Sequence, residues 1–215
     1  MGSKSDDAVA ELLIANLPRD LVMGIEDALT TGGQRAHLAT CMMDKGHLAH
    51  AFGQVRHFHC NEAFHRALSA GNVHPTPISG NSIVTGVSGI FRLGRFNIPP
   101  GMWMNGRRSQ TRRQLALANK AIEQLVQPDI FSEQTVVTEA VAFFVTYFTR
   151  SVEDRAKYNI SIEIAVPDRY LKNWIFRESL KEYLRRYEIK PVQQDLAKPR
   201  LRRDVNKRKS DGEEP

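Results

Sequence analysis

The sequence predicts an α+β fold: a helical N-terminal part, then a mostly antiparallel sheet of about four strands packed by helices, and a disordered basic C-terminal tail. Apolar residues recur at helical spacing through about residue 72. Segments rich in β-branched and aromatic residues, without that spacing, follow at residues 82–98, 135–150 and 160–166. Because strands that are consecutive in sequence tend to pair, we expect most of the pairing to be antiparallel.

The N-terminal part contains three predicted helices. Apolar spacing predicts the first over residues 7–17, where Pro18 ends it, and a second from Pro18 to about residue 29. The Thr-Thr-Gly-Gly sequence at residues 30–33 predicts a break. Helical spacing resumes over residues 34–68, as one kinked helix or two consecutive ones.

The middle of the chain predicts a hairpin followed by a helix. Two apolar runs within residues 82–98 flank Ser88 and Gly89, a pattern typical of two strands joined by a tight turn. Ser109 is a good N-cap residue, and apolar spacing after it predicts an amphipathic helix to about residue 126.

The last part of the chain predicts two strands and a helix. Residues 135–150 indicate a long buried strand and residues 160–166 a half-exposed one. Asp168 then supplies an N-cap for a helix over residues 171–187. We divide the chain into a helical subdomain, an α+β domain and a disordered basic tail, at residues 1–72, 73–188 and 189–215.

Four arginines crowd the start of the helix that Ser109 is expected to cap: Arg107, Arg108, Arg112 and Arg113. The helix dipole disfavours each cation at this end by roughly 0.3–1 kcal/mol. Unpaired N–H groups and guanidinium groups converge there, which indicates a site for an anion such as phosphate. The alternative is that these long side chains extend into water.

Two arginines of the predicted hairpin, Arg92 and Arg95, lie between Phe91 and Phe96 in sequence. Cations beside aromatic rings suit the backbone and the unpaired bases of a single nucleic-acid strand. The alternative is that the two phenylalanines belong to the core.

The charge of the chain favours acidic partners. The net charge is +6, and residues 189–215 hold eight Lys or Arg against five Asp or Glu, so half of the excess lies in the tail. No apolar run approaches the roughly 18 residues of a membrane span, and no secretory signal is evident. With two cysteines and no disulfide framework, we expect a cytoplasmic protein without a membrane partner.

All seven histidines and both cysteines lie between residues 37 and 74. Pairs at helical spacing, such as His57 with Cys60, can supply two metal ligands, but a zinc site needs three or four. CxxC and HExxH patterns are absent. We therefore expect no cofactor, and zinc is kept as an alternative with three candidate ligands: His57, Cys60 and His65.

The leading hypothesis is a cytosolic, non-enzymatic protein that binds a phosphate-bearing polymer, in the first instance nucleic acid, through the arginine-rich helix start. Two alternatives stay open: a metal-dependent hydrolase that uses the His/Cys-rich helices, and an interaction or assembly subunit whose arginines bind an acidic protein. No P-loop, GxSxG elbow or dinucleotide fingerprint is present, and no catalytic residue is assigned. Aromatic residues of the last predicted helix belong either to the core or to a homo-oligomer interface: Trp174, Phe176 and Tyr183.

Overall fold

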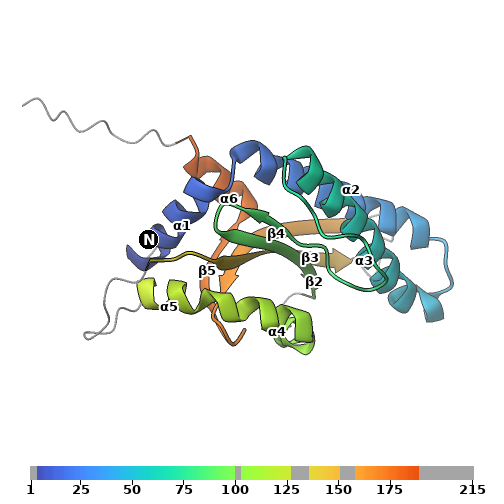
Figure 1. The fold of residues 1–215 in the computed structure, drawn as a ribbon. Helices are drawn as coiled ribbons and strands as arrows, with labels where there is room; N and C mark the ends of the chain where they lie inside the picture. Colours follow the sequence, from blue (N-terminus) through green and yellow to red (C-terminus); the bar gives the residue numbers. More distant parts are fainter. Residues whose placement is uncertain (1–3, 100–102, 127–135, 151–157, 189–215) are drawn as a thin grey trace, which may run out of the picture.

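A computed structural model describes the chain at residues 4–99, 103–126, 136–150 and 158–188. It confirms the α+β class. A sheet forms the middle of three layers (Figure 1). The helices α1 (Lys4–Asn16), α2 (Arg19–Thr40), α3 (Lys45–Ala70) and α6 (Leu180–Arg186) cover one face, whereas α4 (Gln110–Ala116) and α5 (Lys120–Val126) cross the other.

The sheet has the strand order β1-β2-β3-β4-β5 in the described part of the chain. The strands are β1 (Gly86–Ser88), β2 (Phe91–Ile98), β3 (Ala140–Arg150), β4 (Tyr158–Pro167) and β5 (Trp174–Ser179). Antiparallel pairing joins all neighbours except β2 and β3, which are parallel. The mostly antiparallel sheet is therefore confirmed, and the parallel pair explains why α4 and α5 cross between those two strands.

The predicted hairpin is confirmed and is fixed to α1. Gly89 occupies the turn with φ of 54°, a conformation that favours glycine. The Asn16 side chain accepts a hydrogen bond from the backbone N–H of Ile90 (3.1 Å), and Ser88 donates its hydroxyl to the Asn16 carbonyl (2.7 Å). The turn and the C-terminal end of α1 therefore hold each other in place.

The predicted break at residues 30–33 is wrong, because α2 continues through it. Both glycines, Gly32 and Gly33, are buried in α2. A Cβ atom at Gly32 would lie 3.0 Å from the His59 carbonyl oxygen and 3.1 Å from Cys60 Cα, both in the backbone of α3. Glycine therefore serves here to let two helices approach closely, at the cost of helix propensity.

The predicted helix over residues 109–126 is interrupted. It begins as α4, passes through a 3-10 turn, η2 (Leu117–Asn119), and continues as α5; a further 3-10 helix, η1 (Trp103–Arg108), precedes it. The buried Asn119 side chain explains the interruption, since its Nδ2 donates to the carbonyls of Val141 (3.1 Å) and Pro167 (2.7 Å). Its Oδ1 accepts from the Val141 N–H (2.7 Å), so one amide fixes the crossover to β3 and to the end of β4.

The predicted helix over residues 171–187 is wrong in its first half, which forms a turn and then β5. Asp168 does not cap a helix: its carboxylate accepts from the backbone N–H groups of Tyr170, Lys172 and Asn173 and so holds a tight turn. The helical half is α6, and Ser179 caps it by accepting from the Glu182 N–H (3.3 Å).

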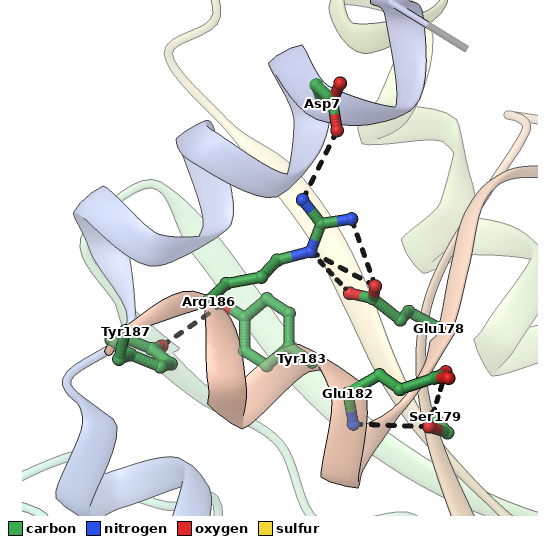
Figure 2. Close-up of polar contacts among 7 residues, drawn as sticks. All are labelled: Asp7, Glu178, Ser179, Glu182, Tyr183, Arg186 and Tyr187. Carbon is green, nitrogen blue, oxygen red and sulfur yellow. Dashed lines mark hydrogen bonds and ion pairs between the residues drawn. The ribbon is translucent and has the colours of Figure 1, made fainter. Parts of the chain in front are cut away.

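Polar contacts fix α6 to the beginning of the chain (Figure 2). Arg186 of α6 pairs with Glu178 of β5 (2.8 Å) and with Asp7 of α1 (3.3 Å). The Tyr187 hydroxyl donates to the Leu17 carbonyl (2.7 Å) and lies 3.2 Å from the Tyr183 hydroxyl. These contacts therefore hold α6, the last described helix, against the N-terminal part of the chain.

Two hydrophobic clusters lie on opposite faces of the sheet. The larger includes Leu13, Phe64 and Phe144 and joins the N-terminal helices to the sheet, and the smaller includes Phe143 under α4. The aromatic residues Phe176 and Tyr183 are buried in the larger cluster, and the partly buried Trp174 packs against the smaller one.

Two further expectations concern the tail and the membrane. The expected disordered tail, residues 189–215, lies outside the described residues. Within the described ranges, no helix combines the length and apolar composition needed to cross a membrane.

The close approach of α2 and α3 gives the first prediction. Gly32→Ala should lower the free energy of unfolding by about 1–3 kcal/mol, because its Cβ meets α3 backbone that cannot rotate away. Gly24→Ala in the same helix is the matched control. No atom lies within 4 Å of a Cβ at Gly24, so this variant should gain roughly 0.5–1 kcal/mol from helix propensity. Urea unfolding of the three proteins measures both effects, and equal shifts in the two variants would contradict the packing argument.

Candidate functional site

The structure divides the six candidate arginines among different environments. Alternation along β2 places Arg92 and Arg95 on opposite faces of the sheet. Arg107 and Arg108 lie in η1, and Arg112 and Arg113 in α4. They form two groups: Arg107 with Arg113 in one pocket, and Arg95 with Arg112 near another. The exposed Arg108 and the half-buried Arg92 line neither pocket.

Ser109 is the N-cap of α4, as predicted. Its hydroxyl accepts a hydrogen bond from the Arg112 backbone N–H (3.3 Å). The Arg112 side chain does not extend into water: its Cζ lies 4.5 Å from the centre of the Phe96 ring, and its Nη1 donates to the Gly106 carbonyl (3.1 Å). Successive residues on a helix point in different directions, so Arg112 faces the sheet while Arg113 is exposed.

The first pocket, which we name the α4 groove, lies between α4 and the turn before β5. Its volume is about 360 Å³. Its lining residues are Arg107, Gln110, Arg113, Gln114, Leu117, Arg169, Tyr170 and Lys172. Four of these are basic and none is acidic, so the groove has a positive potential.

The turn before β5 contributes a cationic and aromatic wall to this groove. Tyr170 is 54% exposed, with Arg169 Cζ 4.8 Å and Lys172 Nζ 5.8 Å from the centre of its ring. Glu123 of α5 pairs with Arg169 (3.2 Å) and so compensates part of the charge. Sequence reasoning missed all three groove residues of this turn, because it placed them at a helix start.

The second pocket, which we name the His57 pocket, lies between α3, the loop before β1 and the start of α4. Its volume is about 340 Å³. Its lining residues are Gln54, His57, Asn81, Ser82, Ile83, Ser109, Thr111 and Arg112. It shares no lining residue with the α4 groove, and it too has no acidic side chain among them.

Arg95 lies behind this pocket and is only 1% exposed. Its Nη2 donates to the carbonyl of His57 (2.6 Å) and to Oδ1 of Asn61 (3.3 Å), and its Nη1 to Oδ1 of Asn97 (3.3 Å). No carboxylate pairs with Arg95 or Arg112 in the described part of the chain. Burial lowers the pKa of Arg95 to about 10, so it stays protonated at neutral pH.

His57 connects the buried arginine to the pocket. Its Nδ1 lies 3.5 Å from Arg95 Nη2. Burial, followed by the charges of Arg95 and Arg112, lowers the pKa of His57 below its ordinary value, and the backbone of Asn81 opposes this shift. His57 is therefore neutral at pH 7, and the two guanidinium groups carry the positive charge.

The candidate zinc ligands His57, Cys60 and His65 all lie on α3. Cys60 is buried, and burial raises the pKa of its thiol, which disfavours the thiolate that binds zinc. Among the described residues, no three His, Cys, Asp or Glu side chains come together in a group that could hold a metal ion.

Comparisons with protein-family models, with curated proteins and with solved structures find no match to this chain. The geometry and charge of the two pockets are therefore the basis for assigning a function.

The lowered pKa of His57 predicts a pH-dependent contribution to stability. Because the folded pKa lies below 6.5, the unfolded chain takes up this proton first. The free energy of unfolding should therefore fall as the pH decreases from about 7 towards 5. In His57→Gln, the part of this decrease that comes from protonation of His57 should be missing. His47→Gln, at an exposed position, is the control. Urea unfolding at several pH values measures it, and parallel pH profiles for wild type and His57→Gln would disprove the expectation.

Proposed function

We propose that the protein is a non-enzymatic nucleic-acid-binding protein and that the α4 groove receives an unpaired strand. The observation that carries this proposal is the groove lining: four cations, an exposed tyrosine ring and no acidic side chain. Cationic grooves with aromatic side chains are typical of proteins that bind single strands without sequence preference.

The groove residues divide into two roles. Arg107, Arg113 and Lys172 would contact phosphate oxygens, which supply most of the salt-dependent affinity. Tyr170 would stack on a base, since a base presents an apolar face and the ring is accessible. Arg108 is exposed and follows the groove residue Arg107 in the sequence. It would add a further phosphate contact.

A cytoplasmic location belongs to this proposal. Cys41 and Cys60 are free thiols, and a reducing compartment keeps thiols in that state. The basic tail, residues 189–215, would act as an electrostatic arm that adds sequence-independent affinity.

Removing two groove cations tests the phosphate contacts. Arg113→Ala/Lys172→Ala should weaken binding of a fluorescent oligo-dT strand by about tenfold or more at low salt. The plot of log binding constant against log salt concentration should also become less steep by about 1.4. Each contact with a single-strand phosphate contributes about 0.7 to this slope. Lys181→Ala/Arg185→Ala removes two exposed cations of α6 and is the matched control. Fluorescence anisotropy at several salt concentrations measures both, with the tail unchanged in every variant.

Removing the aromatic ring tests stacking. Tyr170→Ala should weaken binding of the same strand by about 1–3 kcal/mol while leaving the salt slope unchanged, because stacking releases no counterions. Tyr170→Phe keeps the ring and should bind like wild type. Polyglutamate of similar charge should bind less tightly than oligo-dT and be indifferent to Tyr170→Ala, since it offers no base to stack. No salt-dependent binding of oligo-dT, or equal loss in the groove and control variants, would overturn the proposal.

A further inference from the structure

Arg95 carries a charge for which the fold supplies no counterion. A buried ion costs several kcal/mol unless it is well compensated. Its three hydrogen-bond acceptors, the His57 carbonyl, Asn61 and Asn97, are all neutral. Arg112 is close enough to lower the pKa of Arg95 further. Two guanidinium groups are thus held near each other without an acidic partner in the described residues.

The hydrogen bonds of Arg95 do not explain why an arginine is present. Asn61 Oδ1 also accepts from the Val84 backbone N–H (3.1 Å), and Asn97 Oδ1 also accepts from the Thr146 hydroxyl. Both amides would therefore keep a donor without Arg95. An apolar side chain of similar length would fill the space without the desolvation cost.

The His57 pocket is lined by groups that donate hydrogen bonds. Arg112 presents its guanidinium group, and its Nε is buried without a hydrogen bond. The Ser109 hydroxyl accepts from the Arg112 backbone, so its own proton is available to donate. The Thr111 and Ser82 hydroxyls and the Asn81 amide add donors from other directions.

We propose that the His57 pocket binds a tetrahedral oxyanion, phosphate or a phosphate monoester, with Arg112 as the direct ligand, His57 as a titratable neighbour and Arg95 as the positioning residue behind His57. The donors surround the pocket from α3, α4 and the loop before β1, which suits an anion whose oxygens point in several directions better than a planar carboxylate. A volume of about 340 Å³ accommodates the anion with a small organic group. The site is separate from the α4 groove and does not depend on the function proposed for it.

Arg95 acts on the anion through His57 and through its charge. Its Nη2 faces His57 Nδ1, which favours the tautomer with the proton on Nε2. The anion also compensates the two guanidinium charges and favours the protonated form of His57. Anion binding therefore tightens as the pH falls and His57 becomes protonated.

Isothermal titration calorimetry with inorganic phosphate at constant ionic strength tests the site. Wild type should bind phosphate in preference to chloride and acetate, and Arg112→Gln and Thr111→Val should weaken phosphate binding, Arg112→Gln by at least about tenfold. Methyl phosphate in a parallel titration distinguishes a monoester from the free anion, and tighter binding of either one supports the site. The α6 variant Lys181→Ala/Arg185→Ala should bind phosphate like wild type, which separates the pocket from a general effect of removing surface cations.

Arg95→Met tests the positioning role. This variant should unfold at the same temperature as wild type or higher, yet bind phosphate at least about tenfold more weakly. Sulfate, which remains a dianion across the range, gives the pH profile: its affinity should rise at a higher pH in Arg95→Met, because the pKa of His57 is no longer held down by Arg95. Should Arg95→Met fail to fold, Arg112→Gln and Thr111→Val decide the proposal. Binding of an adventitious ion only, with acetate and phosphate equivalent or with Arg112→Gln unaffected, would overturn it.

Discussion

The parallel pairing of β2 with β3 determines where the basic residues around the start of α4 lie. Two parallel neighbours cannot be joined by a tight turn, so the chain must cross the sheet between Ile98 and Ala140. The crossover begins at the end of β2, and the buried amide of Asn119 fixes it to the backbone of β3. The start of α4 therefore lies where the loop before β1, α3 and the turn before β5 converge. Both pockets form around this short helix.

The two pockets use the basic residues in opposite ways. In the α4 groove Arg113 and Lys172 are exposed, and Arg107 and Arg169 are half-buried. Solvent and added salt therefore screen the charge of the groove, which lies beside an accessible ring. Arg95 is buried with neutral partners, so its charge is costly and little affected by salt. The groove is suited to a long, variable ligand and the His57 pocket to a small, defined one.

Elements whose signal is local could be predicted from the sequence. The hairpin around Gly89, the apolar β3 and the Ser109 cap are of this kind. The failures are tertiary in origin. Glycine at position 32 suggests the end of a helix, but Gly32 instead allows two helices to pack closely. The Asp168 carboxylate holds the turn before β5, and the apolar residues that follow this turn form a strand. Apolar residues at helical spacing continue from β5 into α6, so periodicity alone does not separate the short strand from the helix that follows it.

The arginine-rich helix start was recognisable from sequence as a site of unusual charge, but its division into two pockets was not. Arg112 and Arg113 are adjacent in sequence, yet only contact with Phe96 shows which of them turns inward. The groove residues Arg169 and Lys172 come from a distant turn. Nothing local distinguishes Arg95 from Arg92, since the buried face of β2 is set by the helices that cover it.

The bonds from α6 to α1 bear on how the chain is made. Asp7 and Leu17 leave the ribosome early, whereas their partners Arg186 and Tyr187 are added after every strand of the sheet. Contacts so distant in sequence slow folding, because a long loop must close before they form. The first helix therefore lacks these partners until residues 186 and 187 have been made, so its final docking follows the synthesis of every strand of the sheet.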